Sequence, residues 1–429
     1  MLVNGFLVER ASEALSEMRG FAIPADAAIA QYFKKRPNIG KRDRAAAREL
    51  VFAALRGKEA ADVFLRQNNR LGPDPKRNAR LEILAALTAL EGADPKSFLD
   101  FVDEDEYALL CRCAGARREW MRGLPCESLL PQWFIDELRE GNGAGDDEIK
   151  RLGRALARPA LPCVRCNLLK GPRDKIFERL AQAYPGAEKT RRSPWGARFA
   201  ARADVMGGPF GQSGEIEIQD EGSQLLALLA DARPGKIVVD FCAGAGGKTL
   251  ALGAAMRNKG RLYAMDVNGP RLAKLGPRLK RAGLTAVTPM RLDSENDPRL
   301  ARLRGKADLV FVDAPCSGSG TLKRSPDLKY RQSRETLGAL LPQQASILRA
   351  ASQLTAPGGR LVYATCSVFA RENERQAEAF LAQAPEFRLE SLAPFCRQVG
   401  LPGDSPYFRA DPAEETDGFF AAAFRKAAR

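Results

Sequence analysis

Two cysteines of this 429-residue sequence stand at positions suited to covalent chemistry, each just after an apolar run. Cys316 lies in the stretch DAPCSGSG (313–320), which follows the run DLVFV, and Cys366 follows the run GRLVYAT. A thiolate at either place could attack an electrophilic carbon. A glycine-rich turn of this kind could also cradle a phosphate or be only a tight turn, and a single cysteine is more often a small buried hydrophobe.

The sequence contains no histidine, and this absence narrows the chemistry. It excludes a Ser-His-Asp triad, a Cys-His pair and every metal site built on histidine. Any proton transfer must therefore use a carboxylate, a thiol, a lysine, a tyrosine or water. The pair Cys163 and Cys166 has zinc-like spacing, but two further ligands at matching spacing are missing, so we expect no metal.

The stretch DFCAGAGGKT (240–249) predicts the binding turn of a nucleoside cofactor. An apolar strand ends there, glycines allow a tight turn, and a helix begins, so that backbone amides can point at a ligand. The stretch ends like a Walker A loop, but Cys242 stands where that loop requires a glycine. The dinucleotide pattern G-x-G-x-x-G is also broken. A nucleoside triphosphatase therefore remains only a weaker alternative.

Two aspartates at the ends of the next predicted strands support a nucleoside ligand. Asp266 follows the glycines by about 20 residues, where an acidic side chain can bind a ribose diol. Asp293 ends the following strand and could reach an adenine amino group. The glycine turn and the two aspartates together indicate a nucleoside without a required phosphate, which S-adenosylmethionine fits better than NAD.

A methyl donor beside two thiols indicates a specific reaction. C5 of cytosine is a poor nucleophile until a thiolate adds to C6, after which C5 can attack a methyl group. Asp313 could hydrogen-bond N3 and stabilise the adduct, and a second thiolate or a water could later remove the C5 proton. Positive charge from Lys248, Lys323 or Arg324 would stabilise a thiolate. Spacing alone does not decide which cysteine attacks.

The elements that must position these residues form a regular pattern from about residue 215 onward. Near-continuous apolar strands alternate with amphipathic helices, which is typical of a doubly wound, mostly parallel sheet in an α/β protein. Ligands bind beyond the carboxyl ends of such strands, where all the residues above lie. We expect neighbouring strands to bring the two cysteines together. The strands are expected at 236–242, 260–267, 286–293, 307–313 and 359–366.

The composition favours a polyanionic partner. The net charge is +14 and the sequence pI is near 9.5, and binding to phosphates by lysine and arginine releases counterions. The charge gathers in runs, among them 34–44, 189–202 and 322–334. No apolar run reaches the ~18 residues of a membrane span, and no signal peptide is apparent. We therefore expect a cytoplasmic protein that binds nucleic acid, not a membrane, and acts as a monomer.

Several motifs, in their order, closely resemble those of the Sun-type (RsmB/Fmu-like) bacterial RNA (cytosine-5) methyltransferases. These motifs are DFCAGAGGKT, DAPCSGSGTLKRSPDLKY, ATCSV, TDGFF (416–420) and, upstream, IQDEGSQL (218–225). The resemblance implies a class I methyltransferase domain, a Rossmann-like, seven-stranded, mostly parallel sheet, with S-adenosylmethionine as donor. Two departures stand out: Gly244 and Ala245 replace a common Ala-Pro, and a histidine often found near TDGFF is absent.

The resemblance also implies roles for individual residues. Cys366 is the nucleophile, whereas Cys316 assists product release or acts as base. Asp313 serves both the target cytosine and the donor, and Lys248 belongs with the catalytic group. The residues expected to bind the cofactor are Cys242, Ala243, Gly244, Ala245, Gly246, Gly247, Lys248, Asp266, Arg271, Asp293 and Asp313.

We therefore expect an enzyme that methylates C5 of a cytosine in structured RNA through a covalent adduct of Cys366 with C6. Small-subunit ribosomal RNA is the first expected substrate and transfer RNA the second. An RNA-binding assembly factor of the same fold, with weak catalysis, is the remaining alternative. Three domains are expected: a helical, NusB-like RNA-binding domain at 1–125, a small α+β RNA-recognition subdomain at 126–214, and the methyltransferase domain at 215–429.

Overall fold

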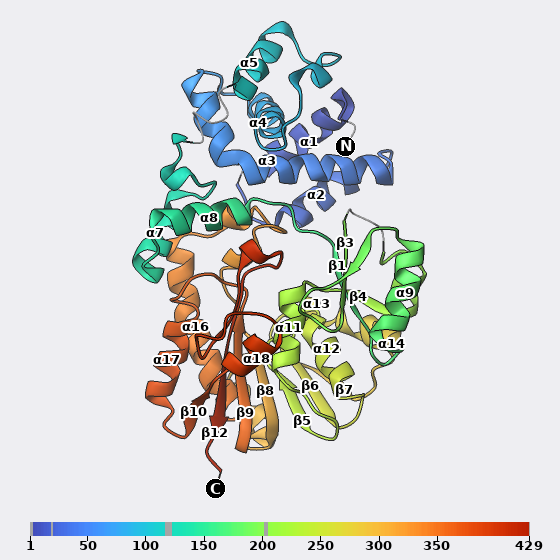
Figure 1. Cartoon of the computed structure of the whole chain (residues 1–429), viewed down its shortest axis with the longest axis vertical. Coiled ribbons are helices and arrows are strands. Elements are labelled where there is room, and N and C mark those ends of the chain that lie inside the picture. Colours follow the sequence, from blue (N-terminus) through green and yellow to red (C-terminus); the bar gives the residue numbers. More distant parts are fainter. Residues whose placement is uncertain (1–2, 19, 116–121, 201–204, 429) are drawn as a thin grey trace. The chain divides into compact units, whose positions relative to one another are not determined.

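The computed structural model describes residues 3–18, 20–115, 122–200 and 205–428 (Figure 1). The chain forms two compact units, of which the first comprises residues 1–159 and 321–334 and the second 160–320 and 335–429. The segment that directly follows the DAPCSGSG turn thus belongs to the first unit, although the turn itself belongs to the second. The predicted domain boundaries near residues 125 and 214 stay a prediction.

The first unit is helical, as the amphipathic pattern of its sequence predicts. Leu50, Val51 and Leu55 lie on one face of its longest helix and are fully buried in the core. Asn4 and Asp74 cap two of the helices by accepting hydrogen bonds from backbone amides. The helices are α1 Gly5–Glu17, α2 Ala25–Lys34, α3 Lys41–Gln67, α4 Pro75–Ala89, η1 Pro95–Phe98, α5 Glu104–Gly115, η2 Pro125–Glu127, α7 Gln132–Asn142, α8 Asp146–Leu156 and α15 Leu328–Arg331.

The segment 321–334 is anchored in the first unit by buried polar and aromatic contacts. Lys329 is 4% exposed, and its Nζ donates to the backbone carbonyls of Arg56 (3.1 Å) and Leu129 (2.8 Å). Burial lowers the pKa of Lys329 to about 8. The ring of Tyr330 stacks on Phe21, with 5.2 Å between the centroids. Part of this basic run therefore serves the core rather than a surface for a polyanion.

The second unit begins with a small antiparallel sheet in the order β2-β3-β1-β4. Its central strand carries Cys163 and Cys166, and both cysteines are buried. The sequence predicts a half-buried strand here, but the second face of β1 is covered as well. The elements are β1 Cys163–Cys166, α9 Arg173–Ala183, β2 Ala187–Lys189, β3 Gly196–Phe199, α10 Pro209–Ser213 and β4 Ile216–Ile218.

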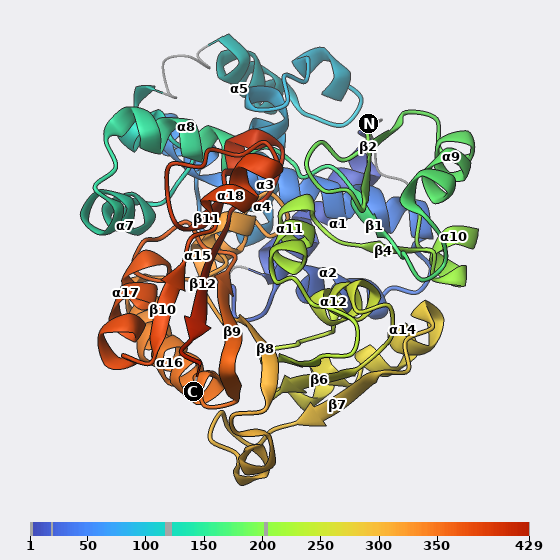
Figure 2. The same cartoon turned by 60° about the horizontal axis from the view of Figure 1, so that its bottom comes forward.

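The larger sheet of the second unit has the order β10-β12-β9-β8-β5-β6-β7 (Figure 1). Strand β11 pairs with β12 (Figure 2). The five strands from β9 to β7 are parallel, whereas β12 is antiparallel to β9. This arrangement confirms the predicted α/β fold with a mostly parallel, doubly wound sheet. The strands are β5 Ile237–Asp240, β6 Arg261–Asp266, β7 Val287–Arg291, β8 Ala307–Asp313, β9 Thr355–Thr365, β10 Phe387–Glu390, β11 Phe408–Ala410 and β12 Phe419–Lys426.

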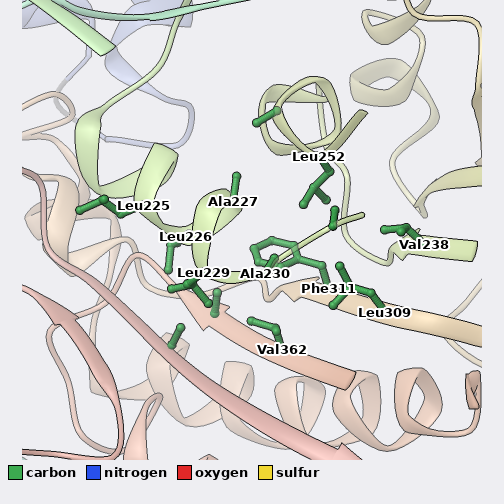
Figure 3. Close-up of a cluster of buried hydrophobic side chains, with 14 of the residues drawn as sticks. Leu225, Leu226, Ala227, Leu229, Ala230, Val238, Leu252, Leu309, Phe311 and Val362 are labelled. Atoms are coloured by element: carbon green, nitrogen blue, oxygen red, sulfur yellow. The ribbon is translucent and has the colours of Figure 1, made fainter. Parts of the chain in front are cut away.

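Helices cover both faces of this sheet because successive strand residues point to opposite sides. Phe311 packs with Leu252 and the other apolar side chains of one face (Figure 3), and Val310 packs with those of the other. None of the described helices is long and apolar enough to span a membrane. The helices are α11 Glu221–Leu229, α12 Gly247–Ala255, α13 Gly269–Leu272, α14 Leu275–Ala282, η3 Pro298–Leu303, η4 Ser319–Thr321, α16 Arg334–Ser352, α17 Glu374–Gln383, α18 Ala393–Gln398 and η5 Pro412–Glu414.

Candidate active site

Most of the predicted site residues gather at one edge of the larger sheet. β5 lies between β6 and β8 in parallel register, and β8 lies beside β9, so the carboxyl ends of four strands meet at this edge. The loops that leave these ends carry the glycine turn, Asp266, the DAPCSGSG turn and Cys366. Such an edge is the usual ligand site of a doubly wound sheet.

The glycine turn between β5 and α12 is tied to β6 by Asp266. The amide of Gly244 donates to Oδ2 of Asp266 at 2.7 Å, and the amide of Asn268 donates to Oδ1 at 2.7 Å. Gly246 caps α12 with a φ of +87°, a conformation that favours glycine. Ala243 pairs with β6 through its amide, and Ala245 accepts a hydrogen bond from Arg278. The turn is therefore held rigidly in place.

The start of α12 borders open space beside the glycine turn. Gly247 is the first residue of α12, and a Cβ built on it meets no atom within 4 Å, so the start of the helix faces open space. The N-terminal amides of a helix attract a carboxylate or other polar group. Arg271 lies against the turn, since a Cβ on Gly244 would approach its Nη2 to 2.7 Å. Residues 242–248, Asp266 and Arg271 are thus brought together.

Two of the residues predicted to bind the cofactor, Asp293 and Cys242, have surroundings that differ from those expected of a ligand-binding side chain. Asp293 lies two residues beyond β7, its side chain is 84% exposed, and its ion-pair partner is Arg299. Its contact with an adenine stays a prediction. The thiol of Cys242 has a pKa well above its ordinary value, because of burial first and then the charges of Asp313 and other nearby carboxylates. Cys242 is therefore a neutral thiol in the wall of the site.

The two predicted catalytic cysteines touch. Their sulfur atoms are 3.4 Å apart, in the loops after β8 and β9. The amide of Ala314 donates to the carbonyl of Ala364 at 2.9 Å, and that of Gly320 donates to the carbonyl of Cys366 at 3.0 Å. The adjacent parallel strands therefore continue to pair beyond their ends, and this pairing brings Cys316 to Cys366.

An ion pair between Lys248 and Asp313 lies beside the cysteines, with 2.6 Å between Nζ and Oδ2. Burial by itself lowers the pKa of Lys248, but the charge and hydrogen bond of Asp313, followed by the charge of Cys366, raise it overall. Lys248 therefore stays protonated. Lys323 and Arg324, which the sequence offers as other sources of positive charge, belong to the segment 321–334 of the first unit.

The thiol of Cys316 has a pKa well above its ordinary value. Its hydrogen bond with Cys366 is the largest cause, followed by burial and by the charges of Cys366 and Glu372. Cys316 is therefore protonated at neutral pH. The two cysteines are chemically unequal despite their similar places in the sequence.

Sequence reasoning misses Glu372, a fully buried carboxylate behind the two cysteines. It accepts hydrogen bonds from Ser317 and Ser367, the residues that directly follow Cys316 and Cys366. In the sequence, the one sign that both loops bind the same residue is that a serine directly follows each cysteine, in CSG and in CSV. Glu372 itself stands in the charged run ARENERQAE, which is indistinguishable from the solvent-exposed face of a helix.

Comparison with known proteins gives a consistent result. Residues 227–425 match the family model described as 16S rRNA methyltransferase RsmB/F. The chain is 30% identical over 315 residues to the probable ribosomal RNA small subunit methyltransferase B of Bacillus subtilis, covering 71% of this chain and 68% of that protein. It is 28% identical over 406 residues to ribosomal RNA small subunit methyltransferase B of Xanthomonas campestris, covering 90% of each.

A solved structure of a methyltransferase homologue from Pyrococcus horikoshii is also similar. It superposes with a TM-score of 0.56 at 27% identity, over 69% of this chain and 100% of that chain. The match in three dimensions agrees with the α/β fold and the mostly parallel larger sheet of the second unit.

Proposed function

The chain belongs to the RsmB/F family of 16S rRNA methyltransferases, and from this premise we propose that it methylates C5 of a cytosine in small-subunit ribosomal RNA. The observation that carries the cytosine-5 chemistry is the contact between the thiols of Cys316 and Cys366 beside Asp313. Methylation of an oxygen or an amino group needs no thiol, whereas methylation of C5 needs one thiol to activate the ring and a group to remove the C5 proton.

S-adenosylmethionine is the methyl donor and, when bound, supplies an electrophilic methyl group. The backbone amides of the glycine turn (242–248) would bind the donor, and the open space beside Gly247 would accommodate it. Asp266 accepts hydrogen bonds from the ribose diol while it anchors the turn. Arg271 lies against the same turn, and Asp293 is proposed to reach the adenine from the edge of the sheet. Asp266 and the glycine turn, which would hold the donor, are already fixed to each other by a hydrogen bond.

Cys366 is the proposed nucleophile. Its thiolate adds to C6 of the cytosine, and this addition makes C5 nucleophilic. The protonated Lys248 stabilises the thiolate, since a neighbouring cation favours the charged sulfur. As the adduct forms, N3 of the ring takes up a proton from solvent, and the N3–H then donates to the carboxylate of Asp313, which stabilises the adduct. The target base must leave its stack to reach the site, which is least costly in a loop or bulge.

Cys316 is proposed to act after methyl transfer. Its high pKa has Cys366 as its largest cause. Once the sulfur of Cys366 is bonded to C6 it is a neutral thioether, so its hydrogen bond with the thiol of Cys316 and its charge no longer raise that pKa as before, whereas burial and the charge of Glu372 remain. Cys316 can then lose its proton to solvent and take the proton from C5, after which the bond between Cys366 and C6 breaks and the product leaves.

A substitution pair tests these roles. Cys366→Ser should abolish methyl transfer, and Cys316→Ser should accumulate a covalent complex with RNA, because the adduct forms but cannot resolve. The complex is measured as a shifted protein band in a denaturing gel, and the product as 5-methylcytosine in small-subunit ribosomal RNA. Cys111→Ser, at an exposed thiol of the first unit, is the matched control and should behave as the unmodified protein.

The opposite pattern, in which Cys366→Ser traps the complex and Cys316→Ser does not, would assign the nucleophile to Cys316. Absence of 5-methylcytosine with the unmodified protein, on ribosomal and on transfer RNA alike, would refute the proposed function.

A further inference from the structure

Glu372 occupies an unusual place for a carboxylate, because its side chain is fully buried between the two cysteine loops. It lies in the turn between Cys366 and α17. Burying an ionised group is costly unless hydrogen bonds replace the lost water. A carboxylate kept in this position therefore requires donors on every side, and the structure supplies them.

Four hydrogen bonds converge on the two oxygens of Glu372. Oε1 accepts from the amide of Ser317 at 2.8 Å and from Nε2 of Gln344 at 2.9 Å. Oε2 accepts from the hydroxyls of Ser317 and Ser367. The two serines directly follow Cys316 and Cys366, so one carboxylate is bonded to both Cys-Ser pairs.

The surrounding groups hold Glu372 and the loops in the same arrangement. Gln344 also donates to the carbonyl of Pro315 at 3.0 Å, and Tyr363 donates to the carbonyl of Glu372 at 2.6 Å. Asn373 accepts from the hydroxyl of Thr365 at 2.6 Å and donates to the carbonyl of Ser367 at 3.0 Å. The network therefore reaches the residues on both sides of each cysteine, through the backbone of Pro315, Ser317 and Ser367 and through the side chain of Thr365.

We propose that Glu372 is a positioning residue that sets the distance between the thiols of Cys316 and Cys366. This role rests on the proposed function, in which one thiol forms the adduct and the other acts on the same ring. The proton that Cys316 must remove is on C5, adjacent to the carbon that Cys366 attacks. The two sulfurs must therefore approach one pyrimidine together, and an error of about 1 Å can cost 100-fold in rate.

Glu372→Gln is the direct test because it preserves the shape of the side chain and removes its charge. The amide provides one acceptor oxygen where the carboxylate provides two, so part of the network must break. Glu374→Gln is the matched control, since Glu374 stands two residues away in the first turn of α17 and pairs with Arg409 instead. Thermal unfolding of both variants establishes that they are folded.

Two measurements report the positions of the thiols. The first is kcat, which should fall about 10- to 100-fold in Glu372→Gln while KM for RNA and for S-adenosylmethionine changes little. The second needs no donor and no RNA. In glutathione redox buffers, Cys316 and Cys366 pass two electrons and two protons to glutathione disulfide, forming one protein disulfide and two molecules of glutathione.

The equilibrium between the free thiols and this disulfide depends on how closely the sulfurs are held. In the unmodified protein the sulfurs are already in contact. We expect the equilibrium constant for disulfide formation to fall about tenfold or more in Glu372→Gln and to stay unchanged in Glu374→Gln. Mass spectrometry of the linked peptides identifies the disulfide and its fraction.

A folded Glu372→Gln protein with unchanged kcat and an unchanged disulfide equilibrium would overturn the inference, as would a loss of thermal stability alone. If Glu372→Gln does not fold, Ser367→Ala removes the bond from its hydroxyl to Glu372, together with the bonds of that hydroxyl to Ser319 and to the amide of Phe369, and the same two measurements then decide in the same way. A shifted disulfide equilibrium in a protein that forms no 5-methylcytosine would support the positioning role and refute the proposed function, so the two failures are distinguishable.

Discussion

Asp240 illustrates how burial controls a single residue of the site. It ends β5 immediately before the glycine turn, is fully buried, and accepts a hydrogen bond from the hydroxyl of Thr249 at 2.6 Å. The pKa of Asp240 is raised to about 7, mainly by burial; the hydrogen bond from Thr249 acts to lower it, and the charge of Asp313 acts to raise it. Near neutral pH this carboxyl group is therefore partly protonated in the folded protein.

This pKa predicts a pH dependence of stability. Between about pH 4 and 7, the folded state keeps a proton on Asp240 that the unfolded state has lost, so stability falls as the pH rises. Asp240→Asn removes this dependence. The free energy of unfolding of the variant and of the unmodified protein is measured in urea from pH 5 to 8. As the pH rises toward 7, the difference between them should change in favour of the variant by up to about 1.4 kcal/mol per pH unit.

Asp308→Asn is a control of opposite sign. Burial acts to raise the pKa of Asp308, but the Ile237 amide and Lys236 lower it overall, so this carboxylate stabilises the fold above about pH 4. Its contribution is lost only as the pH falls below that range. The difference between Asp308→Asn and the unmodified protein should therefore stay constant from pH 5 to 8. If the stability difference between Asp240→Asn and the unmodified protein also stayed constant from pH 5 to 8, the raised pKa of Asp240 would be contradicted.

At the scale of elements, the glycine turn and α12 illustrate how local sequence encodes a site. Gly246 needs a left-handed backbone, whereas Gly247 needs none and borders open space. Other elements depart from their sequence pattern. A proline usually marks the first turn of a helix, but α16 begins at Arg334 and contains Pro342 in its interior. The missing amide of Pro342 costs one hydrogen bond, and burial of residues on both sides of it, such as Leu337 and Leu348, outweighs the loss.

The two adjacent glycines give a matched pair of variants. Gly246→Ala should lower the unfolding midpoint, because its φ is +87° and its Cβ would overlap the side chain of Leu275. Gly247→Ala should leave the midpoint unchanged but raise the Kd for S-adenosylmethionine about tenfold, since the methyl group enters the space proposed for the donor. Scanning calorimetry measures the unfolding midpoint, and titration calorimetry measures the Kd for S-adenosylmethionine. An unchanged Kd in Gly247→Ala would place the donor elsewhere.

For the molecule as a whole, the chain path has a consequence for the two units. The chain leaves the second unit at Gly320, contributes residues 321–334 to the first, and returns at Glu335. Asp327 accepts a hydrogen bond from the amide of Ala25, and Lys329 is bonded to two carbonyls of the first unit. A cut between residues 159 and 160 therefore does not separate two complete folding units.

A fragment of residues 1–159 should accordingly be less stable than the same region of the intact chain. Adding a synthetic peptide of residues 321–334 should raise its Tm in proportion to the logarithm of peptide concentration, because the peptide binds only the folded fragment. A peptide with Lys329→Glu is the control and should have little effect, since a carboxylate cannot donate to the carbonyls of Arg56 and Leu129. Equal effects of both peptides would show that Lys329 does not anchor the segment.

The sequence by itself determined the features that depend on local pattern. Strand and helix periods indicated the doubly wound sheet, glycines and Asp266 marked the turn proposed to bind the cofactor, and the two apolar runs placed Cys316 and Cys366 just beyond the ends of neighbouring strands. Each of these follows from a repeat of a few residues or from the chemistry of one turn. They were therefore readable without any knowledge of distant contacts.

Only the tertiary structure decided which distant side chains meet. It buried Glu372 between the cysteine loops, placed Lys329 in the core of the helical unit, and left Asp293 exposed. In the sequence, all three are charged residues with polar neighbours, and the local pattern predicts that each lies on the surface or binds a ligand. Burial of a charge depends on donors and acceptors far along the chain, and these come together only when the elements pack.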